Sequence, residues 1–98
     1  MRWSDIMWQK HPYSASMMAR LSFGTYELSI VEERGETDLF ECAIFELGEF
    51  VQLPGIHPEP TDTGWDDDVL RFQTREEVIG IVRKLESITG KAPLNVYD

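Results

Sequence analysis

Residues 74–90, TREEVIGIVRKLESITG, decide the fold because they predict a helix with a defined start, one apolar face and a defined end. Thr74 and Glu77 have the spacing of a capping box, in which each side chain accepts a hydrogen bond from the other residue's backbone N–H. Gly90 suits the left-handed conformation that often ends a helix. The apolar stripe consists of Val78, Ile81, Val82, Leu85 and Ile88. A helix with a single apolar stripe must pack against a second layer.

The residues before this helix have the alternating pattern of half-buried strands. Apolar and polar residues alternate over 26–30 and again over 40–44, and Gly35 between them provides a turn residue, so a β-hairpin is expected. Two further segments, 50–53 and 69–73, predict a third and a fourth strand. We therefore predict an α+β fold: a small two-layer domain with a mostly antiparallel sheet of three to four strands, in the order β-β-β-β-α, packed against one C-terminal helix.

The chain divides by composition into two regions. Residues 1–20 are expected to form an N-terminal extension or arm, and residues 21–98 a single α+β domain with a long acidic loop at 54–68. Two interpretations of the extension stay open. It is either a poorly ordered terminus, or an arm that docks through Trp3, Ile6 and Trp8, because tryptophan is enriched in binding hot spots.

Length and composition limit the classes of protein to consider. The chain has 98 residues, with 42% hydrophobic and 28% charged residues, which is typical of one globular domain. The single Cys42 excludes an intramolecular disulfide, and with only two histidines it provides too few ligands for a structural zinc site. We find no signal peptide and no apolar run long enough to span a bilayer, so we expect a cytoplasmic protein without a membrane partner.

The negative charge is concentrated in the middle of the sequence. From Glu27 to Asp68 there are thirteen carboxylates and one base, Arg34, whereas the flanks carry five carboxylates and eight bases, for a net charge of −9. Such a segment attracts basic partners and repels nucleic acids. A basic protein surface is therefore the expected partner, with no direct binding of nucleic acid.

The expected partner-binding residues lie in the acidic loop and on the hairpin. They are Glu59, Asp62, Trp65, Asp66, Asp67 and Asp68 in the loop and Glu32, Glu33, Glu36 and Glu41 on the hairpin. Trp65 favours this interpretation of the loop, because an indole beside carboxylates can stack on a partner's arginine. A merely solvated loop remains the alternative. The spacing does not match a calcium-binding loop, so we predict no metal site.

Catalysis is not expected from the remaining candidates. The hairpin carboxylates alternate with core residues and should point to water rather than into a cleft. Cys42 lies in mid-strand, where a buried and inert thiol is expected, and His57 is expected to be a loop residue. We therefore predict no catalytic residues, no cofactor and no enzymatic activity.

These observations lead to two hypotheses about function. In the first, the chain is a non-enzymatic acidic protein that binds a basic protein surface, such as that of a nuclease or a nucleic-acid-guided complex, as an inhibitor or nucleic-acid mimic. It resembles phage anti-defence proteins such as anti-CRISPRs, and nuclease immunity proteins, in size and charge only. In the second, it is a small structural or assembly subunit that self-associates through the sheet edge or the N-terminal arm, and its acidity provides solubility.

Overall fold

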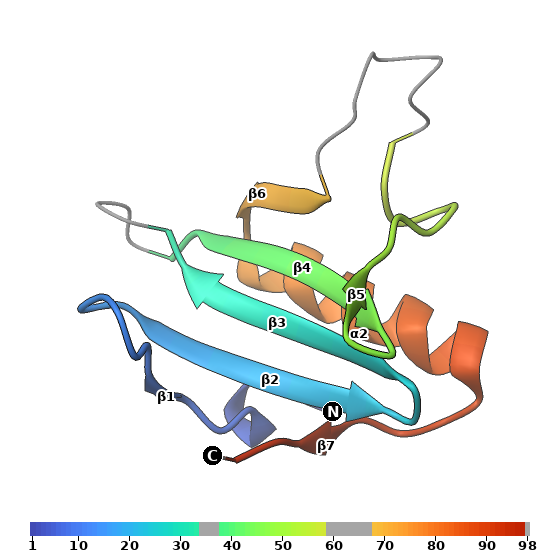
Figure 1. Ribbon diagram of the computed structural model, residues 1–98, viewed down its shortest axis with the longest axis horizontal. Helices are drawn as coiled ribbons and strands as arrows, with labels where there is room; N and C mark the ends of the chain where they lie inside the picture. The colour runs from blue at the N-terminus through green and yellow to red at the C-terminus, as the bar shows by residue number, and fades with distance from the viewer. Residues whose placement is uncertain (34–37, 59–67, 98) are drawn as a thin grey trace.

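The computed structural model describes residues 1–33, 38–58 and 68–97 and has the predicted α+β architecture (Figure 1). An antiparallel sheet forms one layer and a C-terminal helix forms the other. The elements in chain order are η1 (Trp3–Asp5), β1 (Gln9–Lys10), β2 (Met17–Phe23), β3 (Tyr26–Glu32), β4 (Phe40–Glu46), β5 (Glu49–Phe50), β6 (Val69–Gln73), α2 (Arg75–Thr89) and β7 (Leu94–Asn95).

Three long strands, β2, β3 and β4, form the centre of the sheet. The strand order is β1-β2-β3-β4-β5, while β6 also pairs with β4 and β7 also pairs with β2. The predicted hairpin is confirmed as β3–β4, in which Leu28 pairs with Ile44 and Ile30 with Cys42. The predicted third strand is shorter than expected, because β5 ends at Phe50 instead of continuing over 50–53.

Strand β2 begins inside the segment that the sequence assigned to an N-terminal extension. Its residues alternate between buried and half-buried positions, with Ala19, Leu21 and Phe23 facing the core. The small side chain of Ala19 weakens the apolar signal at the start of this strand. The boundary after residue 20 therefore falls within a strand that pairs with β3 along its length.

The core lies between the sheet and α2, which covers one face of the sheet (Figure 1). The helix begins as predicted, since the Glu77 N–H donates to the Thr74 hydroxyl at 3.2 Å and the Thr74 N–H donates to the Glu77 carboxylate at 3.0 Å. It ends at Gly90, whose φ is 67°. The stripe is buried except at its last member, Ile88, which is 50% exposed in the final turn of the helix.

The N-terminal segment packs against its own domain. Ile6 is only 4% exposed and belongs to the core, and Trp3 and Trp8 pack beside it. The Asn95 side chain attaches this segment to the C-terminal strand, because its oxygen accepts from the Met7 N–H and its amide donates to the Asp5 carbonyl, both at 3.0 Å. The sheet and the helix thus hold both tryptophans in fixed positions.

Candidate binding pocket

Six of the ten predicted partner-binding residues lie outside the part of the chain that the structure describes. They are Glu36, Glu59, Asp62, Trp65, Asp66 and Asp67. The other four, Glu32, Glu33, Glu41 and Asp68, occupy different environments. The eighty-four described residues include twelve carboxylates and eight lysines or arginines, so more than half of the net charge of −9 lies in the remaining segments.

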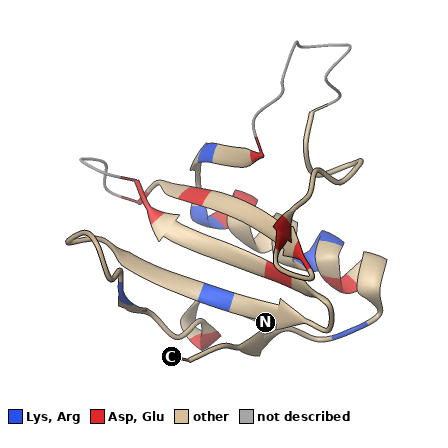
Figure 2. Cartoon of the chain, viewed as in Figure 1, with Lys and Arg blue, Asp and Glu red and all other residues tan. Residues whose placement is uncertain are grey.

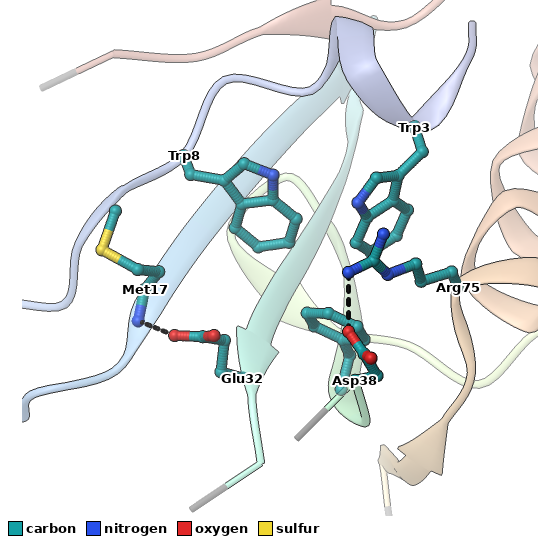
Figure 3. Close-up of a pocket in the computed structure, with 7 residues that line it drawn as sticks. Trp3, Trp8, Met17, Glu32, Asp38 and Arg75 are labelled. Atoms are coloured by element: carbon teal, nitrogen blue, oxygen red, sulfur yellow. Dashed lines mark hydrogen bonds and ion pairs between the residues drawn. The ribbon is translucent and has the colours of Figure 1, made fainter. Parts of the chain in front are cut away.

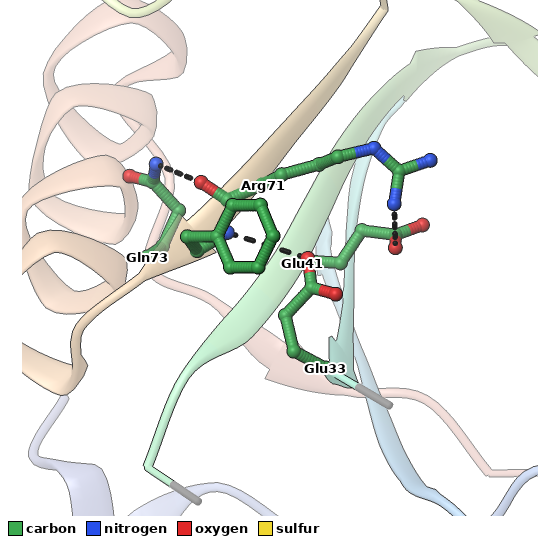
Figure 4. A network of polar contacts seen from close by, with 5 residues as sticks. Glu33, Glu41, Arg71 and Gln73 are labelled. Carbon is green, nitrogen blue, oxygen red and sulfur yellow. Dashed lines mark hydrogen bonds and ion pairs between the residues drawn. The ribbon is translucent and has the colours of Figure 1, made fainter. Parts of the chain in front are cut away.

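Glu33 is not a surface carboxylate, in contrast to the expectation that the hairpin acids point to water. Glu33 is only 8% exposed, and one of its carboxylate oxygens accepts a hydrogen bond from the Phe72 N–H at 3.3 Å (Figure 4). The physical reason lies in β6, where the pairing with β4 shifts register and Phe72 adopts a φ of 55°. This irregularity leaves the Phe72 N–H outside the strand ladder, and Glu33 satisfies it.

Arginines of the chain itself pair with several other carboxylates. Arg71 reaches Glu41 at 2.9 Å (Figure 4), and Arg20 lies 3.8 Å from Glu27. Acidic positions follow β3, β4 and β5, whereas basic positions lie on β2 and β6, and α2 carries both signs of charge (Figure 2). Asp68 also has an internal partner, because it accepts from the Gln52 amide at 3.3 Å. These acids are therefore partly neutralised or engaged within the fold.

Glu46 also has a partner within the fold, the hydroxyl of Tyr26. Tyr26 and Glu46 are directly opposite each other on β3 and β4. A hydrogen bond to Glu46, together with some desolvation and the negative charge of the carboxylate, raises the pKa of Tyr26. The Glu46 carboxylate thus has a hydroxyl partner in the sheet.

Three aromatic rings from distant parts of the sequence come together near the end of the β3–β4 hairpin at which Glu32 pairs with Phe40. The Trp3 and Trp8 centroids are 5.4 Å apart, and they lie 4.9 and 5.6 Å from the centroid of Phe40. These distances are those of stabilising aromatic pairs. Ile6 lies between the two tryptophans in the sequence and is buried in the core. Its burial holds both indoles against the start of β4.

A cavity of about 310 Å³ adjoins these rings and defines the pocket (Figure 3). Its lining residues are Trp3, Trp8, Met17, Glu32, Asp38, Phe40 and Arg75. The pocket thus combines indole faces with two carboxylates. This volume lies at the lower end of the range typical of small-molecule sites.

The first carboxylate of the pocket, Asp38, binds Arg75 at the start of α2. One guanidinium nitrogen lies 2.6 Å from the Asp38 carboxylate, and the guanidinium carbon lies 5.3 Å from the centroid of the Trp3 ring. Both side chains are substantially exposed, so the ion pair contributes little to stability. The arrangement is nevertheless a cation held between an indole face and a carboxylate.

The second carboxylate, Glu32, has a different partner. One of its oxygens accepts from the Met17 backbone N–H at 2.6 Å, on the same side of the pocket as Trp8 (Figure 3). No lysine or arginine within the described ranges forms an ion pair with Glu32. A carboxylate with one oxygen on a single N–H keeps further acceptor positions for a ligand.

The sequence predicted only part of this pocket. Glu32, Trp3 and Trp8 were candidates for binding, whereas Phe40 was expected in the core, and nothing in the sequence indicated Asp38, Met17 or Arg75. The composition of the chain does not reveal that these residues lie together, because the pocket forms only when the N-terminal segment folds back over the start of β4.

Cys42 and His57 do not form a nucleophile and base pair, because both ring nitrogens of His57 have other partners. Cys42 is fully buried, and burial, followed by the charges of Glu41 and Glu77, raises its pKa to about 12. His57 is 5% exposed, with its Nδ1 accepting from the Leu53 N–H and its Nε2 facing the Asp68 carbonyl. Among the described residues, no three histidine, cysteine or acidic side chains are placed to hold a metal ion.

Comparisons with known proteins identify no relative. No protein-family model, no curated protein and no solved structure matches this chain. The helices in the described ranges include none with the length and apolar character needed to cross a membrane.

Proposed function

We propose that this chain is a non-enzymatic interaction protein that binds a basic protein surface. The observation that supports this proposal most directly is the pocket itself, in which two tryptophans and the carboxylates of Glu32 and Asp38 line one cavity. Tryptophan is among the residues that most often dominate the binding energy at protein interfaces. The net charge of −9 adds attraction for a cationic partner.

The two features have separate roles in the proposed interaction. The overall negative charge accelerates encounter with a basic surface, an effect that decreases as salt screens the charges. The pocket then holds a side chain of the partner and slows dissociation, because tightly packed aromatic contacts must be broken. Recognition therefore depends on both the charge and the shape of the partner.

The finer form of the proposal is an inhibitor that occupies a nucleic-acid-binding site, as anti-defence or immunity proteins do, within the cytoplasm. The support for this form is the charge of the chain alone. On the described part of the sheet, Glu27 and Glu41 pair with arginines of the chain itself, so these acids contribute less to a phosphate-like surface. A nuclease or nucleic-acid-guided complex is the partner class with a matching basic groove.

The test is purification of partners from host extract with the wild-type chain and with a variant carrying Glu32→Gln and Asp38→Asn. We expect a protein with a basic surface that the variant retains poorly. Its dissociation constant, measured by calorimetry between 50 and 300 mM salt, should rise about tenfold or more across that range. A partner that binds both chains equally and independently of salt contradicts the proposal.

A second candidate function is self-association as an assembly subunit. Three apolar side chains near β7 favour it: Met7, Leu94 and Tyr97 are 51%, 69% and 66% exposed. Exposed apolar residues at a sheet edge are suited to contacts between copies. Sedimentation at micromolar concentration distinguishes the two functions, because this alternative predicts a dimer or larger species that Leu94→Ser and Tyr97→Ser dissociate at any salt concentration.

A further inference from the structure

The pocket contains two sets of an indole and a carboxylate, and they differ in what fills them. The set made by Trp3 and Asp38 holds the guanidinium of Arg75 at 5.3 Å from the ring centroid and 2.6 Å from the carboxylate. The set made by Trp8 and Glu32 holds no lysine or arginine from the described ranges. Both sets line the same cavity of about 310 Å³ (Figure 3).

Arg75 shows which chemistry suits the walls of this cavity. A guanidinium is planar, so it can stack on an indole while its N–H groups point in the ring plane toward a carboxylate. An ammonium group is compact and strongly hydrated, and it lacks the planar fork that serves both contacts at once. The chain's own arginine already makes these two contacts in one half of the cavity.

Glu32 keeps the hydrogen-bond acceptor positions and the negative charge that a second guanidinium requires. Its one described hydrogen bond, from the Met17 N–H at 2.6 Å, fixes the orientation of the carboxylate without neutralising its charge. Trp8 is held in place by its ring contacts with Trp3 and Phe40. The second half of the cavity is therefore preorganised before a ligand arrives, which lowers the entropic cost of binding.

We infer that the Trp8–Glu32 half of the pocket binds the guanidinium of an arginine side chain from a protein partner. This inference rests on the proposed function, because it names the group through which a basic surface engages the chain. The charge of the ligand complements Glu32 and the net charge of −9, and its plane matches the indole face.

The experiment is an NMR titration of the full chain with two short capped peptides, Ac-Gly-Arg-Gly-NH2 and Ac-Gly-citrulline-Gly-NH2. Citrulline has the shape of arginine without its charge. We expect the arginine peptide to shift the indole N–H signals of Trp3 and Trp8, assigned with Trp3→Phe and Trp8→Phe, with a dissociation constant of about 1–10 mM. Equal shifts with citrulline, or with the corresponding lysine peptide, would overturn the inference.

Variants with matched changes in charge distinguish binding in the pocket from general electrostatic attraction to the negatively charged chain. Glu32→Gln should weaken binding of the arginine peptide about fivefold, and Glu49→Gln less than twofold, because Glu49 lies on β5 at the opposite end of β4 from Phe40. Arg75→Gln should tighten binding about fivefold by making the Trp3–Asp38 half available. Arg83→Gln, which changes the charge equally on the same helix, is its control. If the two variants of either pair, Glu32→Gln with Glu49→Gln or Arg75→Gln with Arg83→Gln, change peptide affinity equally, the peptide does not bind in the pocket.

Failure of this inference can be distinguished from failure of the proposed function. If a basic partner binds in a salt-dependent manner but neither tryptophan responds to the arginine peptide, the partner uses another surface and only the inference fails. If the peptide binds as expected but no basic partner is found, the arginine pocket stands and the proposed function fails.

Discussion

The Nε2 atom of His57 lies 3.2 Å from the carbonyl oxygen of Asp68, so one imidazole joins the two ends of the long acidic segment. Its Nδ1 accepts from the Leu53 N–H at 3.0 Å, which places the ring proton on Nε2, where it donates to Asp68. The residue is 5% exposed. His57 therefore has a structural role at the base of this segment.

Replacing His57 should destabilise the protein substantially. His57→Ala leaves the Leu53 N–H and the Asp68 carbonyl without their partners, so we expect the free energy of unfolding in urea to fall by about 2–4 kcal/mol. His11→Ala is the matched control, because His11 accepts one exposed hydrogen bond from the Tyr13 N–H, and it should cost less than about 1 kcal/mol. Similar losses in the two variants would contradict the structural role.

The N-terminal segment should contribute to stability through a single core residue. Ile6 is 4% exposed whereas the adjacent Met7 is 51% exposed. We expect Ile6→Ala to lower the free energy of unfolding by about 2–4 kcal/mol and Met7→Ala by less than about 1 kcal/mol. Urea denaturation of both variants provides the measurement. If Ile6→Ala has no effect, the segment does not pack on the core, and the pocket would lose the wall that holds Trp3 and Trp8.

The sequence predicted the parts of the fold that local signals specify. The capping box of Thr74 and Glu77 located the helix, and the alternation around Leu28 and Ile44 located the hairpin, because each signal acts over a few neighbouring residues. The start of β2 gave a weaker signal, since Ala19 occupies a core position without a bulky side chain.

The site depended on contacts that local signals do not contain. Arg75 had no visible role until the N-terminal segment placed Trp3 beneath its guanidinium. Glu33 had the pattern of a surface acid, yet the irregular backbone at Phe72 turns an N–H toward it and buries the carboxylate. Spacing in the sequence determines which face of a strand a residue occupies, but not which distant element then covers that residue.

The turn between β4 and β5 provides a stabilising substitution. Leu47 and Gly48 both have positive φ angles, 52° and 84°, the combination required in a type I′ hairpin turn, and Leu47 is 78% exposed. Asparagine tolerates this conformation better than leucine, so Leu47→Asn should raise the free energy of unfolding by about 0.5–1 kcal/mol. Gly48→Ala should lower it by about 1 kcal/mol through backbone strain alone, because nothing lies within 4 Å of the added carbon. Thermal denaturation checks both signs, and destabilisation by Leu47→Asn would refute the turn assignment.

Burial of Cys42 should make stability depend on alkaline pH. The folded-state pKa of about 12 exceeds the ordinary value of 9.0, because burial disfavours the thiolate. The folded state therefore retains the proton more strongly than the unfolded state. The resulting stability is fully present below pH 9 and is lost as the pH rises toward 12.

A comparison of the wild type with Cys42→Ala isolates this effect, because the tyrosines and lysines titrate in both proteins. The advantage of the wild type in free energy of unfolding should be about 2 kcal/mol smaller at pH 10.5 than at pH 8. At pH 8 the native thiol should react with a disulfide reagent only as fast as the protein opens, whereas the urea-unfolded chain reacts at once. Rapid labelling of the native protein, or a difference between the two proteins that stays constant with pH, would show that Cys42 is accessible to solvent, and its exclusion from the candidate site would have to be reversed.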